Sequence, residues 1–363
     1  MNKIISLFFI LLSSSAFGHP GDCPGPHADQ LKNLGKFASE VSILGEHSAS
    51  DANIAFANCR SKVLSDQETE KWLEDFAKGD STDDDNEHGI DFKNQSKKLL
   101  EIFDTLTTLD RDIIKTRYEF QSNCNTVICA AKEIFGPSVG PKMLYMMAKF
   151  GLNASPYQVN AEPWSKEELE VSLQGIEDLP PGTLPFEDNK RFARFPRGKT
   201  YTAYTEMNGC VQANSVMDFF DCGFNFGREN SIQTAFHEAA HYIGDELGLD
   251  EMSKWRELSG WEVVNRPNGN GGVDSYWEPT KIQCMVSTYG FTNPIEDFSE
   301  SMVAYRYNPE PLKKNCPEKY KFLKDLVFRG IEYTDPKLCE NKKIDGSLTD
   351  SLKWHLKKIK YQF

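Results

Sequence analysis

Apolar residues recur every three or four positions between residues 231 and 247, which is the period of one face of an α-helix. Asn230 or Ser231 can cap the start of this helix. Gly248 can end it, because glycine readily adopts the left-handed conformation that often follows a helix. The pattern therefore predicts a helix over residues 231–247. Its apolar positions are Ile232, Ala235, Phe236, Ala239, Ala240, Ile243 and Leu247.

A second helix is predicted over residues 294–307. Asn293 is a good N-cap, and Pro294 suits the first helical position because its missing N–H would have no partner there. Glu296 and Glu300 then share one face, a single turn apart. Acidic residues in a first turn also complement the helix dipole, so these positions alone do not establish a site.

The first half of the chain reads mainly as helices. Ser65-x-x-Glu68 and Ser165-x-x-Glu168 both have the spacing of a capping box, in which the serine and glutamate each bond to the other's backbone N–H. The acidic stretch over residues 80–89 lacks the ordered spacing of a calcium-binding loop, and we expect a solvated loop there.

Two segments downstream contain β-prone residues. Residues 199–205 and 211–220 could form strands, and one of them could pair with an extended substrate. Residues 265–274 are rich in Asn and Gly and indicate a flexible loop or hairpin tip, either a lid or a plain surface turn. We expect core positions rather than substrate platforms for the flanking tryptophans, which are Trp255, Trp261 and Trp277.

The predicted fold class is α+β. A mainly helical N-terminal domain over residues 19–180 precedes a catalytic domain over residues 181–335, and residues 336–363 form a C-terminal tail. The catalytic domain would combine a small sheet with the two helices predicted above. The N-terminal domain could serve as a substrate-recognition module, an inhibitory pro-region or a scaffold.

The start of the chain has the pattern of a signal peptide. Lys3 precedes an apolar run over residues 4–12, and small residues lead up to Gly18. We expect cleavage after Gly18 and a secreted or periplasmic protein; a retained anchor is the alternative. The formal net charge of −13 disfavours nucleic-acid and anionic-membrane partners.

The nine cysteines, none in a Cys-x-x-Cys pair, indicate disulfides rather than a second metal site in an exported protein. Cys124 with Cys129, and Cys210 with Cys222, are local bridges that their spacing allows. Cys284 is close in sequence to the predicted site, and we expect it to be buried as a small hydrophobic residue.

The first predicted helix carries the sequence His-Glu-x-x-His at residues 237–241. His237 and His241 lie one turn apart on the same face and can bind one zinc ion. Glu238 lies beside that face, where its carboxylate can take a proton from zinc-activated water. The motif predicts a site for one zinc ion per chain.

A third protein ligand is needed, and no suitably spaced histidine follows. Glu296 is the better candidate because it lies on the second predicted helix, downstream of the histidines. Glu300 would then hold a ligand histidine through the other ring N–H of that histidine.

These elements resemble the catalytic core of the anthrax lethal factor group, which includes the secreted Pro-Pro endopeptidases. The resemblance covers about residues 231–305, through His-Glu-x-x-His and then Tyr289-Gly290-x-Thr292-Asn293-x-x-Glu296-x-Phe298-x-Glu300. It implies a zincin-like fold of the glutamate-ligand (gluzincin) kind, with zinc on His237, His241 and Glu296. It also implies that the Tyr289 hydroxyl donates to the oxyanion; a packing role for that tyrosine is the alternative.

The predicted function is hydrolysis of peptide bonds by an exported zinc endopeptidase, with Glu238 as general base and a peptide or protein as substrate. Two alternatives stay open. One is a zinc-stabilised binding module without catalytic activity, which Glu238 argues against because a structural zinc needs no base. The other is hydrolysis of a non-peptide amide by the same residues.

Overall fold

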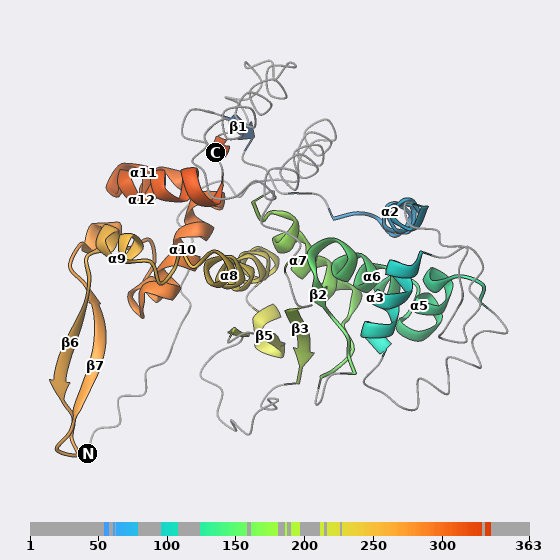
Figure 1. Ribbon diagram of the computed structural model, residues 1–363, viewed down its shortest axis with the longest axis horizontal. Coiled ribbons are helices and arrows are strands. Elements are labelled where there is room, and N and C mark those ends of the chain that lie inside the picture. The colour runs from blue at the N-terminus through green and yellow to red at the C-terminus, as the bar shows by residue number, and fades with distance from the viewer. Residues whose placement is uncertain are drawn as a thin grey trace. The chain divides into compact units, whose positions relative to one another are not determined.

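The computed structural model describes residues 54–57, 61, 63–78, 96–107, 124–157, 161–180, 186, 190–196, 211–213, 216–225, 227–328 and 331–334 (Figure 1). The chain divides into two compact units that do not follow sequence order. The terminal unit contains Met1–Lys62, Glu177–Thr183 and Phe236–Phe363. The central unit contains Val63–Ile176 and Leu184–Ala235. The linear domain boundaries given above stay a prediction.

The central unit combines helices with one small sheet. Helix α6 packs against α2, α3 and α5, and most of its side chains are buried. The sheet has the strand order β2-β3-β5-β4, with β4 antiparallel to β5 and the other pairs parallel. The elements are α2 (Asp66–Lys78), α3 (Lys97–Thr107), α5 (Val127–Phe135), α6 (Val139–Phe150), β2 (Leu152–Asn153), α7 (Lys166–Glu177), β3 (Lys190–Phe195), β4 (Val211–Ala213), β5 (Val216–Phe220) and η2 (Asp221–Phe224).

Both predicted capping boxes are present. The Ser65 backbone N–H donates to the Glu68 carboxylate at 2.9 Å, and the Glu68 backbone N–H donates to the Ser65 hydroxyl at 3.3 Å. Ser165 and Glu168 make the same reciprocal bonds, both at 3.2 Å. These bonds satisfy first-turn donors that otherwise lack partners, so the two helices begin where the sequence predicts.

The terminal unit contains two further small sheets, β1 with β8 in parallel and β6 with β7 antiparallel. Helix α8 begins in the central unit and continues into the terminal unit. The elements are β1 (Ile54–Ala57), α8 (Arg228–Leu247), α9 (Ser253–Ser259), β6 (Trp261–Pro267), β7 (Val273–Pro279), η3 (Ile282–Cys284), η4 (Tyr289–Phe291), α10 (Pro294–Tyr307), α11 (Pro309–Asn315), α12 (Pro317–Phe322), the single π-turn η5 (Leu323–Val327) and β8 (Ile331–Thr334). The mixture of helices and small sheets confirms the α+β class.

The predicted end of α8 is confirmed, and its predicted start is wrong. Gly248 has φ +60°, and the backbone N–H of Leu249 bonds to the Gly244 carbonyl at 2.9 Å, which closes the helix. At the other end α8 begins at Arg228, so Ser231 lies inside it and not at the cap. The Ser231 hydroxyl instead donates to the Gly223 carbonyl at 3.0 Å, a contact that the helical period could not reveal.

The segment at residues 265–274 is a hairpin tip. Strands β6 and β7 extend well into it and pair from Trp261 with Pro279 to Pro267 with Val273, and the ribbon projects away from α9 (Figure 1). Trp255 and Trp261 are buried, as predicted, and Trp277 is half-buried. Residues 211–220 form two short strands, β4 and β5, while the predicted strand at 199–205 lies outside the described residues.

Two disulfides are present among the described residues. Cys124 bonds to Cys129, as predicted. Cys284 is buried, as predicted, and it also forms a disulfide with Cys316, 32 residues away in sequence, which was not predicted. Such a bridge depends on the packing of η3 against α11, which no local spacing encodes. The predicted Cys210–Cys222 bridge involves a residue outside the described part of the chain, and the predicted signal peptide and the loop predicted at residues 80–89 also lie outside it.

Within the described part of the chain, no helix is long and apolar enough to cross a membrane.

Candidate metal centre

Helix α8 presents two imidazoles on one face within the terminal unit. His237 and His241 are one turn apart, and their rings meet edge to face with centroids 4.8 Å apart. The opposite face of this part of the helix is apolar, and its residues Phe236, Ala239 and Ile243 are buried. This division of the helix surface fixes the direction in which the histidines point.

Helix α10 brings a carboxylate to the same place. The Asn293 side chain accepts hydrogen bonds from the backbone N–H groups of Ile295 and Glu296, both at 2.9 Å. Pro294 occupies the first turn, as predicted. The cap thereby fixes the first turn of α10, from which the Glu296 side chain extends. Asn293 and Pro294 therefore help to position Glu296.

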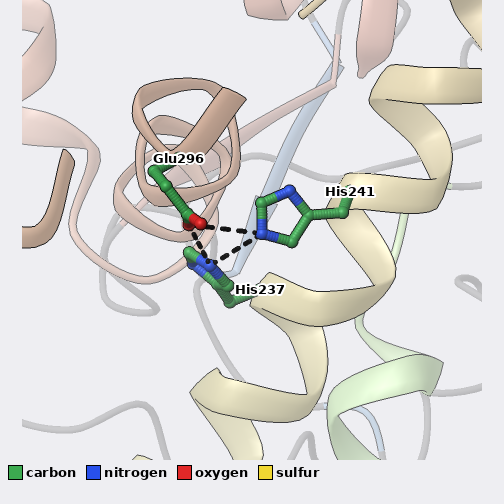
Figure 2. Close-up of side chains that lie close together, drawn as sticks. All are labelled: His237, His241 and Glu296. Atoms are coloured by element: carbon green, nitrogen blue, oxygen red, sulfur yellow. Dashed lines mark hydrogen bonds and ion pairs between the residues drawn. The ribbon is translucent and has the colours of Figure 1, made fainter. Parts of the chain in front are cut away.

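Figure 2 shows the two imidazoles and the carboxylate pointing toward one another from the two helices. Nε2 of His237 lies 3.1 Å from Nε2 of His241 and 3.1 Å from Oε2 of Glu296. Nε2 of His241 lies 3.3 Å from the same carboxylate oxygen. These three residues form a group that could hold a metal ion. The triangle is close to the ligand–ligand separation of about 3.3 Å expected for tetrahedral coordination at about 2.05 Å.

The outer nitrogen of His237 faces a second carboxylate. Its Nδ1 lies 2.8 Å from Oε1 of Glu300, although the ring N–H is not aimed straight at that oxygen. Burial alone would raise the pKa of the Glu300 carboxyl, but the adjacent His237 imidazole and the Ser287 hydroxyl hold it below its usual value. An ionised carboxylate can only accept, so the proton of a neutral His237 belongs on Nδ1 and the lone pair of Nε2 faces inward.

The outer nitrogen of His241 faces a serine. Nδ1 of His241 lies 3.0 Å from the hydroxyl oxygen of Ser299, which is fully buried on α10. Ser299 is not among the site residues predicted from the sequence. A signal for it was present, because Glu296, Ser299 and Glu300 are spaced to share one face of the helix.

The electrostatics of the group favour a bound cation. Three carboxylates and two imidazoles gather here, and the inward-facing atoms are nitrogen and oxygen acceptors. Burial alone would lower the pKa of His237, but hydrogen bonds to Glu296 and Glu300 raise it well above its usual value. Likewise, burial alone would raise the pKa of Glu296, but the two imidazoles lower it strongly. Without another cation, the imidazole of His237 has to supply the compensating positive charge.

The Glu238 carboxylate lies apart from the triangle. It is buried, with 8 % of its surface exposed, and burial raises the pKa of its carboxyl above the usual value, while His237 and His241 oppose that rise. A carboxylate with a raised pKa binds a proton more readily, as a general base in this position requires.

The side chain of Tyr289 also contacts the group formed by His237, His241 and Glu296. Its hydroxyl donates to Oε1 of Glu296 at 3.3 Å, and its ring centroid lies 5.8 Å from that of His237. Burial and the carboxylates around it raise the pKa of Tyr289, so its proton stays available for donation. The hydroxyl thus borders the group on the Glu296 side.

A second buried cluster lies around Asp297, the next residue along α10. Its Oδ1 accepts from the Lys319 ammonium at 2.6 Å, and its Oδ2 accepts from the Ser259 hydroxyl at 2.8 Å and the Trp261 indole N–H at 3.0 Å. Lys319 also donates to the carbonyl of disulfide-bonded Cys284 at 2.8 Å. This network ties α9, β6, η3 and α12 to the first turn of α10, and therefore supports the backbone that carries Glu296.

All six residues selected from the sequence are in the terminal unit around one centre. His237, His241 and Glu296 converge, Glu300 contacts His237, Tyr289 contacts Glu296, and Glu238 lies beside the imidazoles. The roles assigned to them stay predictions. Comparison with known proteins gives no match to a family model, to a curated protein or to a solved structure.

Proposed function

We propose that this protein is an exported zinc-dependent endopeptidase of the gluzincin kind. The observation that carries the proposal is the triangle of Nε2, Nε2 and Oε2 atoms from His237, His241 and Glu296, with separations of 3.1–3.3 Å. Two histidines and one glutamate are the protein ligands of several catalytic zinc sites, and they leave the fourth position open. The resemblance of the sequence motifs to those of the anthrax lethal factor group supports the same function.

The donor set fits zinc by geometry and by chemistry. Imidazole nitrogen and carboxylate oxygen suit a borderline-soft cation, and each ligand atom already faces the common centre (Figure 2). When bound, zinc polarises a carbonyl and makes a water molecule acidic near neutral pH. One ion per chain would also balance the excess of carboxylates around the histidines.

Glu238 is proposed as the general base. Its buried carboxylate would take the proton of the attacking water and later pass that proton to the leaving amine. The raised pKa of its carboxyl assists the first transfer.

Tyr289 is proposed to donate a hydrogen bond to the oxygen that becomes negative during attack. Its hydroxyl now donates to Oε1 of Glu296 and could turn toward a substrate carbonyl beside that carboxylate. Such a donor contributes more in the transition state than in the ground state, because the charge on the substrate oxygen grows.

A purely structural zinc site is the competing interpretation. Structural sites are commonly closed by four Cys or His ligands, whereas the described residues here offer three. The buried Glu238 carboxylate beside the imidazoles has no role in such a site and incurs a desolvation cost there. We therefore favour catalysis, and the choice between peptide and non-peptide amides depends on substrate trials.

The decisive experiment measures zinc content and peptide cleavage on the mature protein. A diverse library of unstructured peptides is incubated with wild type and with Glu238→Gln, and products are read by mass spectrometry. We expect one zinc per chain in both proteins, and products only with wild type, lost on chelation. The general-base role predicts a fall in turnover of about 10²–10⁴-fold.

Two outcomes would contradict the proposal. A wild type that binds no zinc removes the metal centre. A zinc-loaded wild type that cleaves no peptide removes the peptidase and leaves the non-peptide amide or the structural site. Retained cleavage by Glu238→Gln would refute the role of that residue alone.

A further inference from the structure

We propose that Ser299 is a positioning residue that orients the metal ligand His241, and this inference rests on the metal centre of the proposed function. The Ser299 hydroxyl lies 3.0 Å from Nδ1 of His241, on the side of the ring away from Glu296 and His237. Ser299 is fully buried, so water does not compete for this contact. The hydroxyl can therefore accept the Nδ1 proton and leave the Nε2 lone pair facing the metal.

The contact decides which ring nitrogen is available. A neutral imidazole carries one proton, and only the unprotonated nitrogen can bind a metal ion. An acceptor at Nδ1 favours the form with the lone pair on Nε2, which is the atom that faces Oε2 of Glu296 at 3.3 Å. The hydrogen bond also restricts rotation of the imidazole about the Cβ–Cγ bond of His241.

The two ligand histidines are thus held by chemically different partners from one helix. Glu300, a carboxylate, contacts Nδ1 of His237, and Ser299, a neutral hydroxyl, contacts Nδ1 of His241. Three carboxylates already surround the centre, and a fourth in place of Ser299 would add repulsion within a buried region. A hydroxyl orients the second imidazole without that added charge.

Ser301 provides a matched control. It lies two residues further along α10, is fully buried like Ser299, and donates to Oδ1 of Asp297 at 3.3 Å, not to a ligand histidine. Replacing either serine with alanine removes one buried hydroxyl from the same helix. Only Ser299→Ala removes a contact to the metal centre.

Zinc affinity is measured on the full-length mature chain by competition with a chromophoric chelator, for wild type, Ser299→Ala, Ser299→Thr and Ser301→Ala. We expect Ser299→Ala to bind zinc about 10–100-fold more weakly, the usual effect of losing such an outer partner. Ser299→Thr keeps the hydroxyl and should restore most of the affinity. Ser301→Ala should bind zinc as wild type does.

The absorption spectrum of the cobalt-substituted protein gives a second readout. The visible bands report ligand geometry, so Ser299→Ala should shift them, whereas Ser301→Ala should not. Ring ¹⁵N spectra of the zinc-loaded wild type give a third readout that needs no variant. They should show His241 protonated at Nδ1, with exchange of that proton slowed by the hydrogen bond.

The outcomes separate this inference from the proposed function. A wild type without zinc overturns both. A wild type that binds zinc, combined with unchanged affinity and unchanged cobalt bands in Ser299→Ala, overturns the role of Ser299 alone. An Nδ1 proton on His241 that exchanges as fast as in free imidazole also overturns it, even if Ser299→Ala does not fold.

Discussion

Two buried clusters of charged side chains surround adjacent residues of helix α10, Glu296 and Asp297. The two clusters differ in how their charges are balanced. Around Asp297 one carboxylate meets the Lys319 ammonium, and hydroxyl and indole donors fill the remaining acceptor positions. Around Glu296 three carboxylates face two imidazoles, and the inner atoms are all acceptors unless an imidazole takes a second proton. The first cluster is complete without a ligand, whereas the second gains from a cation.

Burial of charge alone therefore does not mark a functional site. Lys319 and Asp297 are among the most buried ionisable groups described, and their network connects secondary-structure elements. The Glu296 cluster is distinguished by an excess of converging acceptors at coordination distance. The comparison predicts that changes at Asp297 act on stability, whereas changes at Glu296 act on metal binding.

The largest expected effect follows Asp297→Ala. This change leaves the Lys319 ammonium buried without its counter-ion, and breaking a buried pair in this way costs about 3–5 kcal/mol of the free energy of unfolding. Urea unfolding of the metal-free protein measures it. Adding Lys319→Met should recover part of the loss, because the unpaired charge is removed. An Asp297→Ala protein as stable as wild type would show that the cluster contributes little to the free energy of unfolding.

Glu296→Ala is expected to show the opposite behaviour. Loss of one of three ligands should weaken zinc binding by more than about 100-fold, beyond the usual effect of an outer partner. The free energy of unfolding of the metal-free protein should fall less than in Asp297→Ala, because Glu300 remains beside His237 as a counter-charge when Glu296 is lost. Equilibrium dialysis and urea unfolding test the two halves of this prediction. Equal zinc affinity in variant and wild type would remove Glu296 from the ligand set.

Glu300→Ala should have an intermediate effect. The contact of Glu300 with Nδ1 of His237 orients that ring but does not reach the metal, so we expect zinc affinity to fall by about 10–100-fold. The same dialysis experiment ranks it against Glu296→Ala. If Glu300→Ala strips the metal and Glu296→Ala does not, the two roles are reversed.

The smallest expected effect follows Trp261→Phe. It removes one indole N–H donor from Oδ2 of Asp297, which keeps the Ser259 hydroxyl as a partner. We expect a loss of about 1 kcal/mol in the free energy of unfolding, typical of one hydrogen bond. Zinc affinity should not change. A fall in affinity comparable to that of Glu300→Ala would mean that the two clusters are coupled through α10.

Local features of the fold were the most predictable from sequence. The ends of α10, the closing glycine of α8 and the two capping boxes depend on a few neighbouring residues, and each was predicted correctly. The start of α8 was predicted wrongly because Ser231, a residue type that often caps helices, does not cap this one. Its hydroxyl instead donates to the carbonyl of Gly223, outside the helix.

Long-range partners were the least predictable. The Cys284–Cys316 bridge and the pairing of Lys319 with Asp297 join segments that are separate in sequence. Lys319 reads as an ordinary surface lysine, since nothing in its neighbourhood indicates burial. Ser299 was overlooked for a different reason: its position on the ligand face of α10 was visible, but a serine in a helix has many possible partners.

Helical periodicity, which can be read from the sequence, establishes which side chains share a face. His237 with His241, and Glu296 with Ser299 and Glu300, are neighbours because the α-helix repeats every 3.6 residues. The two faces meet through tertiary packing, which brings atoms from residues 59 positions apart in sequence to within 3.1 Å. Helical periodicity is set by local backbone hydrogen bonds, whereas the meeting of α8 and α10 depends on apolar burial and polar networks spread over the whole terminal unit.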